Sequence, residues 1–155
     1  MRYAMRRMKT TTSFLLTSVW YLFIVFSVLS GCSFISPYSQ HAYEQATSLK
    51  VEALALMGKA TEPYVKHEIA VEELMTKIEQ AYEYAKGLPK NELSTQQWEI
   101  LKSPDRNLLG GFLKRWKEKS TLSSVFIREA QGLVGNAFDT IIGLESGKIK
   151  PDEVS

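Results

Sequence analysis

The 155-residue chain has one cysteine and two histidines, and this scarcity excludes several kinds of site. A single cysteine cannot form a disulfide within the chain, so the fold must depend on its apolar core. Neither His41 nor His67 is followed by a second histidine four residues later, as the zinc-protease helix motif requires. Gly132–Gly135 lacks the Lys-Ser/Thr ending of a phosphate loop, and we interpret its glycines as close-packing points in a helix. The sequence therefore predicts no metal site and no cofactor.

Paired carboxylates also give little support to catalysis. An acid and base pair requires that at least one carboxyl be buried, so that its pKa shifts. Glu79 and Glu83 lie one turn apart on a helix face outside the apolar stripe, which predicts that both are solvated. Asp139 and Glu129 lie in the most apolar helical segment and are the better candidates for a buried acid. We predict that the chain is not an enzyme, with a hydrolase as the least favoured alternative.

The first 31 residues differ from the rest of the chain. They contain four basic residues and no acidic one, and then an almost wholly apolar run from Phe14 to Leu29. A cationic start, an apolar segment of about 7–15 residues and small residues at a cleavage point are the parts of a secretory signal peptide. The run is slightly shorter than the roughly 20 apolar residues of a membrane-spanning helix. An uncleaved anchor is the alternative, whereas a buried helix is disfavoured because nothing else in the chain could cover so apolar a segment.

The end of this segment reads Leu29-Ser30-Gly31-Cys32 and resembles the lipobox of bacterial lipoproteins. The resemblance implies that Cys32 receives a diacylglycerol, that the chain is cut before it, and that its new amino group is acylated. Several acyl chains anchor firmly, because each buried methylene contributes roughly 0.8 kcal/mol. In Gram-negative lipoproteins an Asp after the cysteine favours the inner membrane. Ser33 stands there, so the resemblance implies the outer membrane, facing the periplasm.

The positive net charge belongs to the leader. Four of the 19 Lys and Arg residues and none of the 17 Asp and Glu residues lie in it, which leaves 15 against 17, or −2, for residues 32–155. Nucleic-acid binding requires a basic domain or a clear basic face. The sequence predicts no nucleic-acid partner.

Apolar residues spaced three and four apart predict helices in the remaining chain, and few windows alternate as a strand requires. We predict an all-α bundle of three long helices, with one or two short helices between the second and the last. The Gly110-Gly111 pair predicts a bend or a close helix contact.

The expected divisions are a signal peptide (1–31), a lipidated cysteine and tether (32–40), the bundle (41–147) and a flexible tail (148–155). The expected helices cover about 42–60, 63–87, 94–102 and 108–119, and then a segment from a cap among Ser120, Thr121 and Ser123 to Glu145.

One stretch mixes cations with aromatic rings, at Phe112–Lys119. Such a mixture suits an acidic protein partner. It also suits an anionic membrane surface, where each cation contributes about 1 kcal/mol to the free energy of binding. The alternative is that the rings face the core and the cations are simply solvated. The candidate contact residues are Trp98, Lys114, Arg115, Trp116 and Lys117.

These features predict a membrane-anchored envelope lipoprotein that acts as a non-catalytic binding or assembly module for an envelope protein. The alternative function is the binding of a small ligand or lipid. That function requires an enclosed apolar cavity between the alanine-rich first helix and the Phe126–Phe138 segment.

Overall fold

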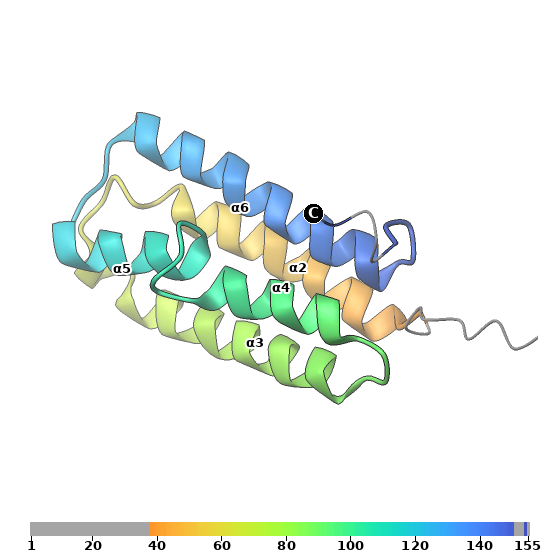
Figure 1. Ribbon diagram of the computed structural model, residues 1–155. Coiled ribbons are helices and arrows are strands. Elements are labelled where there is room, and N and C mark those ends of the chain that lie inside the picture. Colours follow the sequence, from red (N-terminus) through yellow and green to blue (C-terminus); the bar gives the residue numbers. More distant parts are fainter. Residues whose placement is uncertain (1–37, 151–153, 155) are drawn as a thin grey trace, which may run out of the picture. The chain divides into compact units, whose positions relative to one another are not determined.

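The computed structural model describes residues 38–150 and 154, and within them it is helical without strands. The predictions for the signal peptide, Cys32 and the tether up to residue 37 lie outside the described residues. The three long helices and two short helices of the all-α prediction are confirmed (Figure 1). The helices are α2 (Gln40–Met57), α3 (Glu68–Gly87), α4 (Glu92–Lys102), α5 (Leu109–Lys119) and α6 (Ser124–Glu145), with a short 3-10 turn, η1 (Tyr64–Lys66), before α3.

The long helices form the body of the bundle. α2 packs against α3 and α6, and α4 packs against the same two helices from the other side. α2 contributes small side chains to the core, including Ala46 and Ala53, and these let its neighbours approach closely. No helix in the described part of the chain is long and apolar enough to cross a membrane.

Apolar residues lie on more than one side of α6, but not all of them are buried. Val134 and Phe138 are fully buried, whereas Leu133 is 54% exposed. The Gly132 side of the helix also faces solvent, and a Cβ there would meet nothing within 4 Å, so its interpretation as a close-packing point is wrong. A Cβ on Gly135 would lie 3.9 Å from Leu54, which is ordinary contact. Gly132 and Leu133 are exposed because α2 and α4 cover only one side of α6.

Several helix ends differ from the expected ones. α2 begins at Gln40, because the Ser39 hydroxyl accepts a hydrogen bond from the Ala42 amide and caps the helix. α3 begins at Glu68 rather than near residue 63, because the 3-10 turn η1 comes first. The C-terminal residues 148 and 149 are not a loose tail, since both of their amides donate to the carbonyl of Gly143, at 3.0 and 3.1 Å. Gly147, with a φ of +68°, makes the turn that returns the chain.

The two glycines at the start of α5 allow the loop after α4 to lie directly on the helix. A Cβ on Gly110 would lie 2.1 Å from the carbonyl oxygen of Lys102. A Cβ on Gly111 would lie 1.8 Å from the carbonyl oxygen of Arg106. Both distances are far below any real contact, so only glycine fits at either position. The predicted close contact is therefore confirmed.

Candidate functional site

Both tryptophans among the candidate contact residues are core residues. Trp98 is 2% exposed and its ring meets Phe138 edge to face, with ring centroids 5.8 Å apart. Trp116 is fully buried, and its indole Nε1 donates a hydrogen bond to the carbonyl of Glu62 at 3.0 Å. The core alternative is therefore the correct one for these two rings, and neither can contact a partner while the domain is folded.

The three cations among the candidates are exposed on α5, and each is engaged differently. Lys117 lies 3.2 Å from Glu68, and this hydrogen bond raises the pKa of the lysine above its ordinary value. The Arg115 guanidinium lies over the ring of Phe126, 4.5 Å from its centroid. Lys114 is 3.3 Å from Asp105. This last pair contributes little, because both side chains are largely solvated.

Lys114 and Arg115 also line a shallow surface depression of about 420 Å³, which we call the basic depression. The loop before α5 supplies its other wall, which Gly111 brings onto the helix. Four basic and two acidic side chains line it, so the surface carries a local excess of positive charge. Its charged residues are Asp105, Arg106, Lys114, Arg115, Glu118 and Lys119.

Arg106 is the member of this surface that sequence reasoning missed. It lies in a loop eight residues before Lys114, and no helical spacing connects the two residues. The one indication in the sequence is the Gly110-Gly111 pair, because two adjacent glycines predict that another segment of backbone lies close to the start of α5. Lys117, by contrast, was a candidate but does not line the depression.

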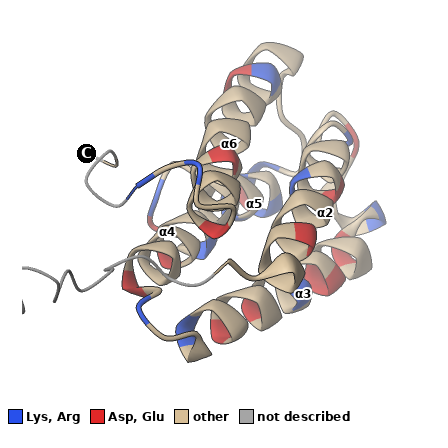
Figure 2. Cartoon of the chain, turned by 90° about the vertical axis from the view of Figure 1, so that its right-hand side faces the viewer, with Lys and Arg blue, Asp and Glu red and all other residues tan. Residues whose placement is uncertain are grey.

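Charge is unevenly distributed among the helices. α3 carries five Glu against two Lys, and α5 carries four Lys or Arg against one Glu. Figure 2 shows the acidic residues recurring along α3. The basic surface of α5 therefore stands out in a domain whose sequence is slightly acidic as a whole.

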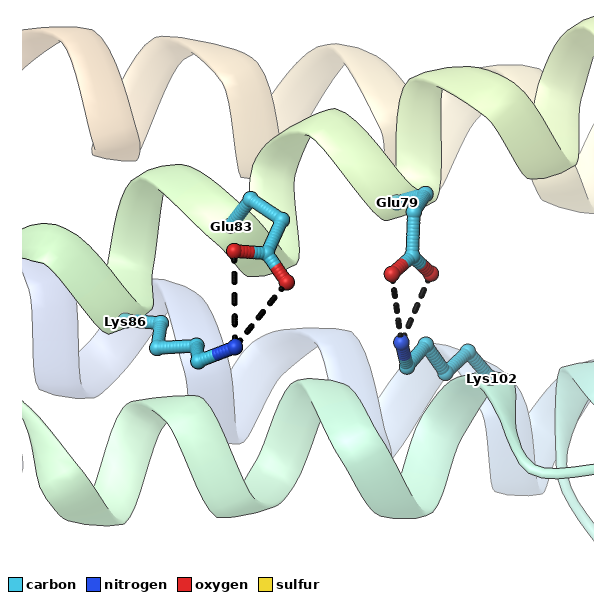
Figure 3. Close-up of polar contacts among 4 residues, drawn as sticks. All are labelled: Glu79, Glu83, Lys86 and Lys102. Atoms are coloured by element: carbon cyan, nitrogen blue, oxygen red, sulfur yellow. Dashed lines mark hydrogen bonds and ion pairs between the residues drawn. The ribbon is translucent and has the colours of Figure 1, made fainter.

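The acidic residues that were considered for catalysis are engaged in surface ion pairs. Glu79 is 2.6 Å from Lys102 of α4, and Glu83 is 3.1 Å from Lys86 (Figure 3). The hydrogen bond from Lys86 to Glu83 raises the pKa of Lys86. Figure 3 shows the two carboxylates directed at separate lysines rather than at each other. The Glu79 and Glu83 side chains are 52% and 56% exposed, which confirms the solvated interpretation.

The expectation of a buried Asp139 or Glu129 is wrong. Glu129 is exposed, and the Asp139 side chain is 60% exposed and lies 2.5 Å from Lys50. Neither acid lies in the buried core of the bundle. The buried acid is Glu145, at 4% exposure, which accepts hydrogen bonds from Ser94 and from the Asn91 amide. This cluster joins the end of α6 to the start of α4 and is a structural contact.

Neither histidine forms part of a metal site. His41 is exposed and lies in the first turn of α2. His67 immediately precedes α3, and its ring packs on that of Trp116, with ring centroids 5.5 Å apart. Its Nε2 is buried without a hydrogen bond, 3.4 Å from a carboxylate oxygen of Glu62. In residues 38–150 and 154, no group of three His, Cys, Asp or Glu residues could hold a metal ion.

The helices proposed to enclose a ligand pack directly on each other. Gln131 of α6 donates a hydrogen bond to the carbonyl of Leu54 in α2 at 2.8 Å. Lys50 and Asp139 join the same two helices farther along. The basic depression is therefore the best candidate for a functional surface. Comparison with known proteins finds no matching family model, no matching curated sequence and no matching solved structure.

Proposed function

We propose that this chain is a bacterial envelope lipoprotein, anchored through acylated Cys32, whose helical bundle binds an acidic surface of another envelope protein without catalysis. The observation that carries the binding role is the group of four cations around one depression. The rest of the chain after the leader is net acidic, so this excess is local. Cations in this arrangement suit the carboxylates of a partner, through charge-assisted hydrogen bonds.

The position of the basic depression favours a protein partner over the membrane surface. α5 lies at the end of the bundle at which α2 ends, away from the start of α2 (Figure 1). With its 18 residues, α2 is about 27 Å long. Five residues lie between Cys32 and Tyr38, and the six Cα–Cα steps of this link span at most about 22 Å. An anchor at Cys32 therefore holds the start of α2 near the lipid and leaves the basic depression directed toward the periplasm.

Charge reversal in the basic depression tests the binding role. A full-length, tagged protein with Lys114→Glu and Arg115→Glu is expected to recover at least about tenfold less of its partner after cross-linking in intact cells, because both charges would repel an acidic surface. The measurement is the amount of each cross-linked protein by quantitative mass spectrometry. A protein that the natural sequence captures and the variant does not is the partner.

The matched control is Lys59→Glu with Lys148→Glu, which makes the same change in net charge at exposed residues outside the depression. This control should capture the same partner in the same amount. Equal recovery by the natural sequence and by the Lys114 and Arg115 variant would contradict the proposal. Binding of the natural sequence to anionic vesicles through these two residues alone, with no protein captured, would favour the membrane instead.

A further inference from the structure

Two aromatic pairs lie where α2 begins, and we call their four side chains the aromatic cluster. His41 meets the ring of Tyr84 edge to face, with centroids 4.8 Å apart. Tyr38 and Tyr43 form a second pair, with centroids 6.5 Å apart. The hydroxyl of Tyr84 also lies within hydrogen-bond distance of Ser39, at 3.1 Å. The cluster therefore joins the first turn of α2 to the last part of α3.

The aromatic cluster is unusually exposed for aromatic residues of this domain. Tyr38 is 60% exposed and Tyr84 is 37% exposed. These two are the only exposed Phe, Tyr or Trp residues in the described part of the chain, and the other large exposed apolar residues are aliphatic. The charge next to Tyr84 is balanced, because Glu83 is paired with Lys86. The outer face of α2 continues from Tyr43 along a shallow, mainly apolar depression that includes Val51 and Ala55, and Glu44 and Glu52 also line it.

Tyrosine is enriched at membrane interfaces, because its ring is apolar and its hydroxyl remains hydrated among the headgroups. The short tether favours the start of α2 as the end of the bundle that meets the lipid. If Cys32 is the anchor, Tyr38 is at most about 22 Å along the chain from it. The exposed aromatic rings thus lie at the end of the domain that the anchor holds closest to the bilayer.

We propose that the aromatic cluster rests in the headgroup layer of the membrane that holds the anchor, and that it orients the bundle with α5 directed away from that membrane. This inference depends on the lipid anchor of the proposed function. It adds a non-covalent contact to the covalent anchor: the exposed aromatic rings bind the lipid headgroups. The orientation keeps the basic depression accessible to a partner in the periplasm.

The orientation can be measured with single fluorescent labels on the full-length, lipidated protein in vesicles of phosphatidylethanolamine and phosphatidylglycerol. An acylated Cys32 leaves no other thiol, so an added cysteine is the only labelling site. Gln40→Cys places the label in the first turn of α2, and Thr121→Cys places it between α5 and α6; both residues are exposed. Lipids that carry a quencher near the headgroup are expected to quench the label at position 40 strongly and the label at position 121 weakly.

A paired substitution tests the role of the rings. Tyr38→Ser with Tyr84→Ser is expected to remove most of the quenching at position 40, while circular dichroism shows unchanged helix content. The matched control is Val65→Ser with Ile69→Ser, which removes two apolar side chains, each 74% exposed, near the opposite end. This control should leave the quenching at position 40 as it was.

The outcomes separate the two proposals. Protein that remains on the vesicles but is quenched equally at positions 40 and 121 would overturn the inference alone. Quenching at position 40 that survives the loss of Tyr38 and Tyr84 would do the same. Protein that fails to carry a lipid and does not stay on the vesicles would overturn the anchor and the inference together.

Discussion

Replacing Gly111 with alanine is expected to destabilise the domain by about 3 kcal/mol, which is a large part of the roughly 5–15 kcal/mol that stabilises a typical domain. The new Cβ would lie 1.8 Å from the carbonyl oxygen of Arg106. That oxygen belongs to the backbone, so it cannot rotate away as the end of a side chain could. The loop over α5 would have to move, and the wall of the basic depression would move with it. Chemical denaturation followed by circular dichroism measures the loss.

Gly132→Ala is the matched control for this prediction. Gly132 is also inside a helix, but a Cβ there would meet nothing within 4 Å. Because alanine favours a helix more than glycine does, this variant should be more stable by about 0.5–1 kcal/mol. If both variants had the same stability, the loop could not lie as close to α5 as the structure places it.

Truncating Trp116 to alanine is expected to cost about 3–5 kcal/mol, as for other large buried aromatic residues. The substitution leaves a cavity below α5 and removes the ring on which Tyr64 and His67 pack. It also leaves the carbonyl of Glu62 without its indole donor. Thermal and denaturant unfolding of the variant give the free-energy difference.

Trp116→Phe separates the two contributions. It keeps most of the apolar volume but has no N–H group, so its cost should be only about 1–3 kcal/mol, the penalty of a carbonyl that loses its partner. A Trp116→Ala variant with unchanged stability would show that the indole is not in the core. In that case its role as a contact with a partner would again be open.

Much of the fold could be predicted from periodic spacing. The residues from Ala42 to Ala60 and from Val71 to Ala85 repeat at three and four, and their buried faces agree with the structure. The glycine pair in α5 predicted a close approach, which the structure has. These features are local, so the sequence contains enough information to locate them.

Other features depend on how distant segments meet, and no local pattern contains that information. Glu145 is buried only because Asn91 and Ser94, more than 50 residues away, satisfy its carboxylate. Leu133 appeared to belong to an apolar stripe but is exposed, because α2 and α4 cover another face of α6. For the same reason, the sequence alone could not decide whether Trp98 and Trp116 face the core or a partner.

The candidate site was partly predictable. Lys114 and Arg115 were identified from the density of charge around them, which is visible in the sequence. Arg106 reaches the same surface because a loop folds back onto α5, and this is a property of the backbone path. Helical periodicity therefore identifies the residues that the helix contributes to this surface, but not those that the preceding loop contributes.

The lipid anchor is the central claim, and the intact mass of the protein purified from bacterial membranes tests it most directly. We predict a chain that begins at Cys32 and carries the mass of a diacylglycerol and of a further acyl group. A Cys32→Ser variant should lose that mass and leave the membrane fraction. A natural-sequence protein that begins at Met1 with an unmodified thiol would contradict the account.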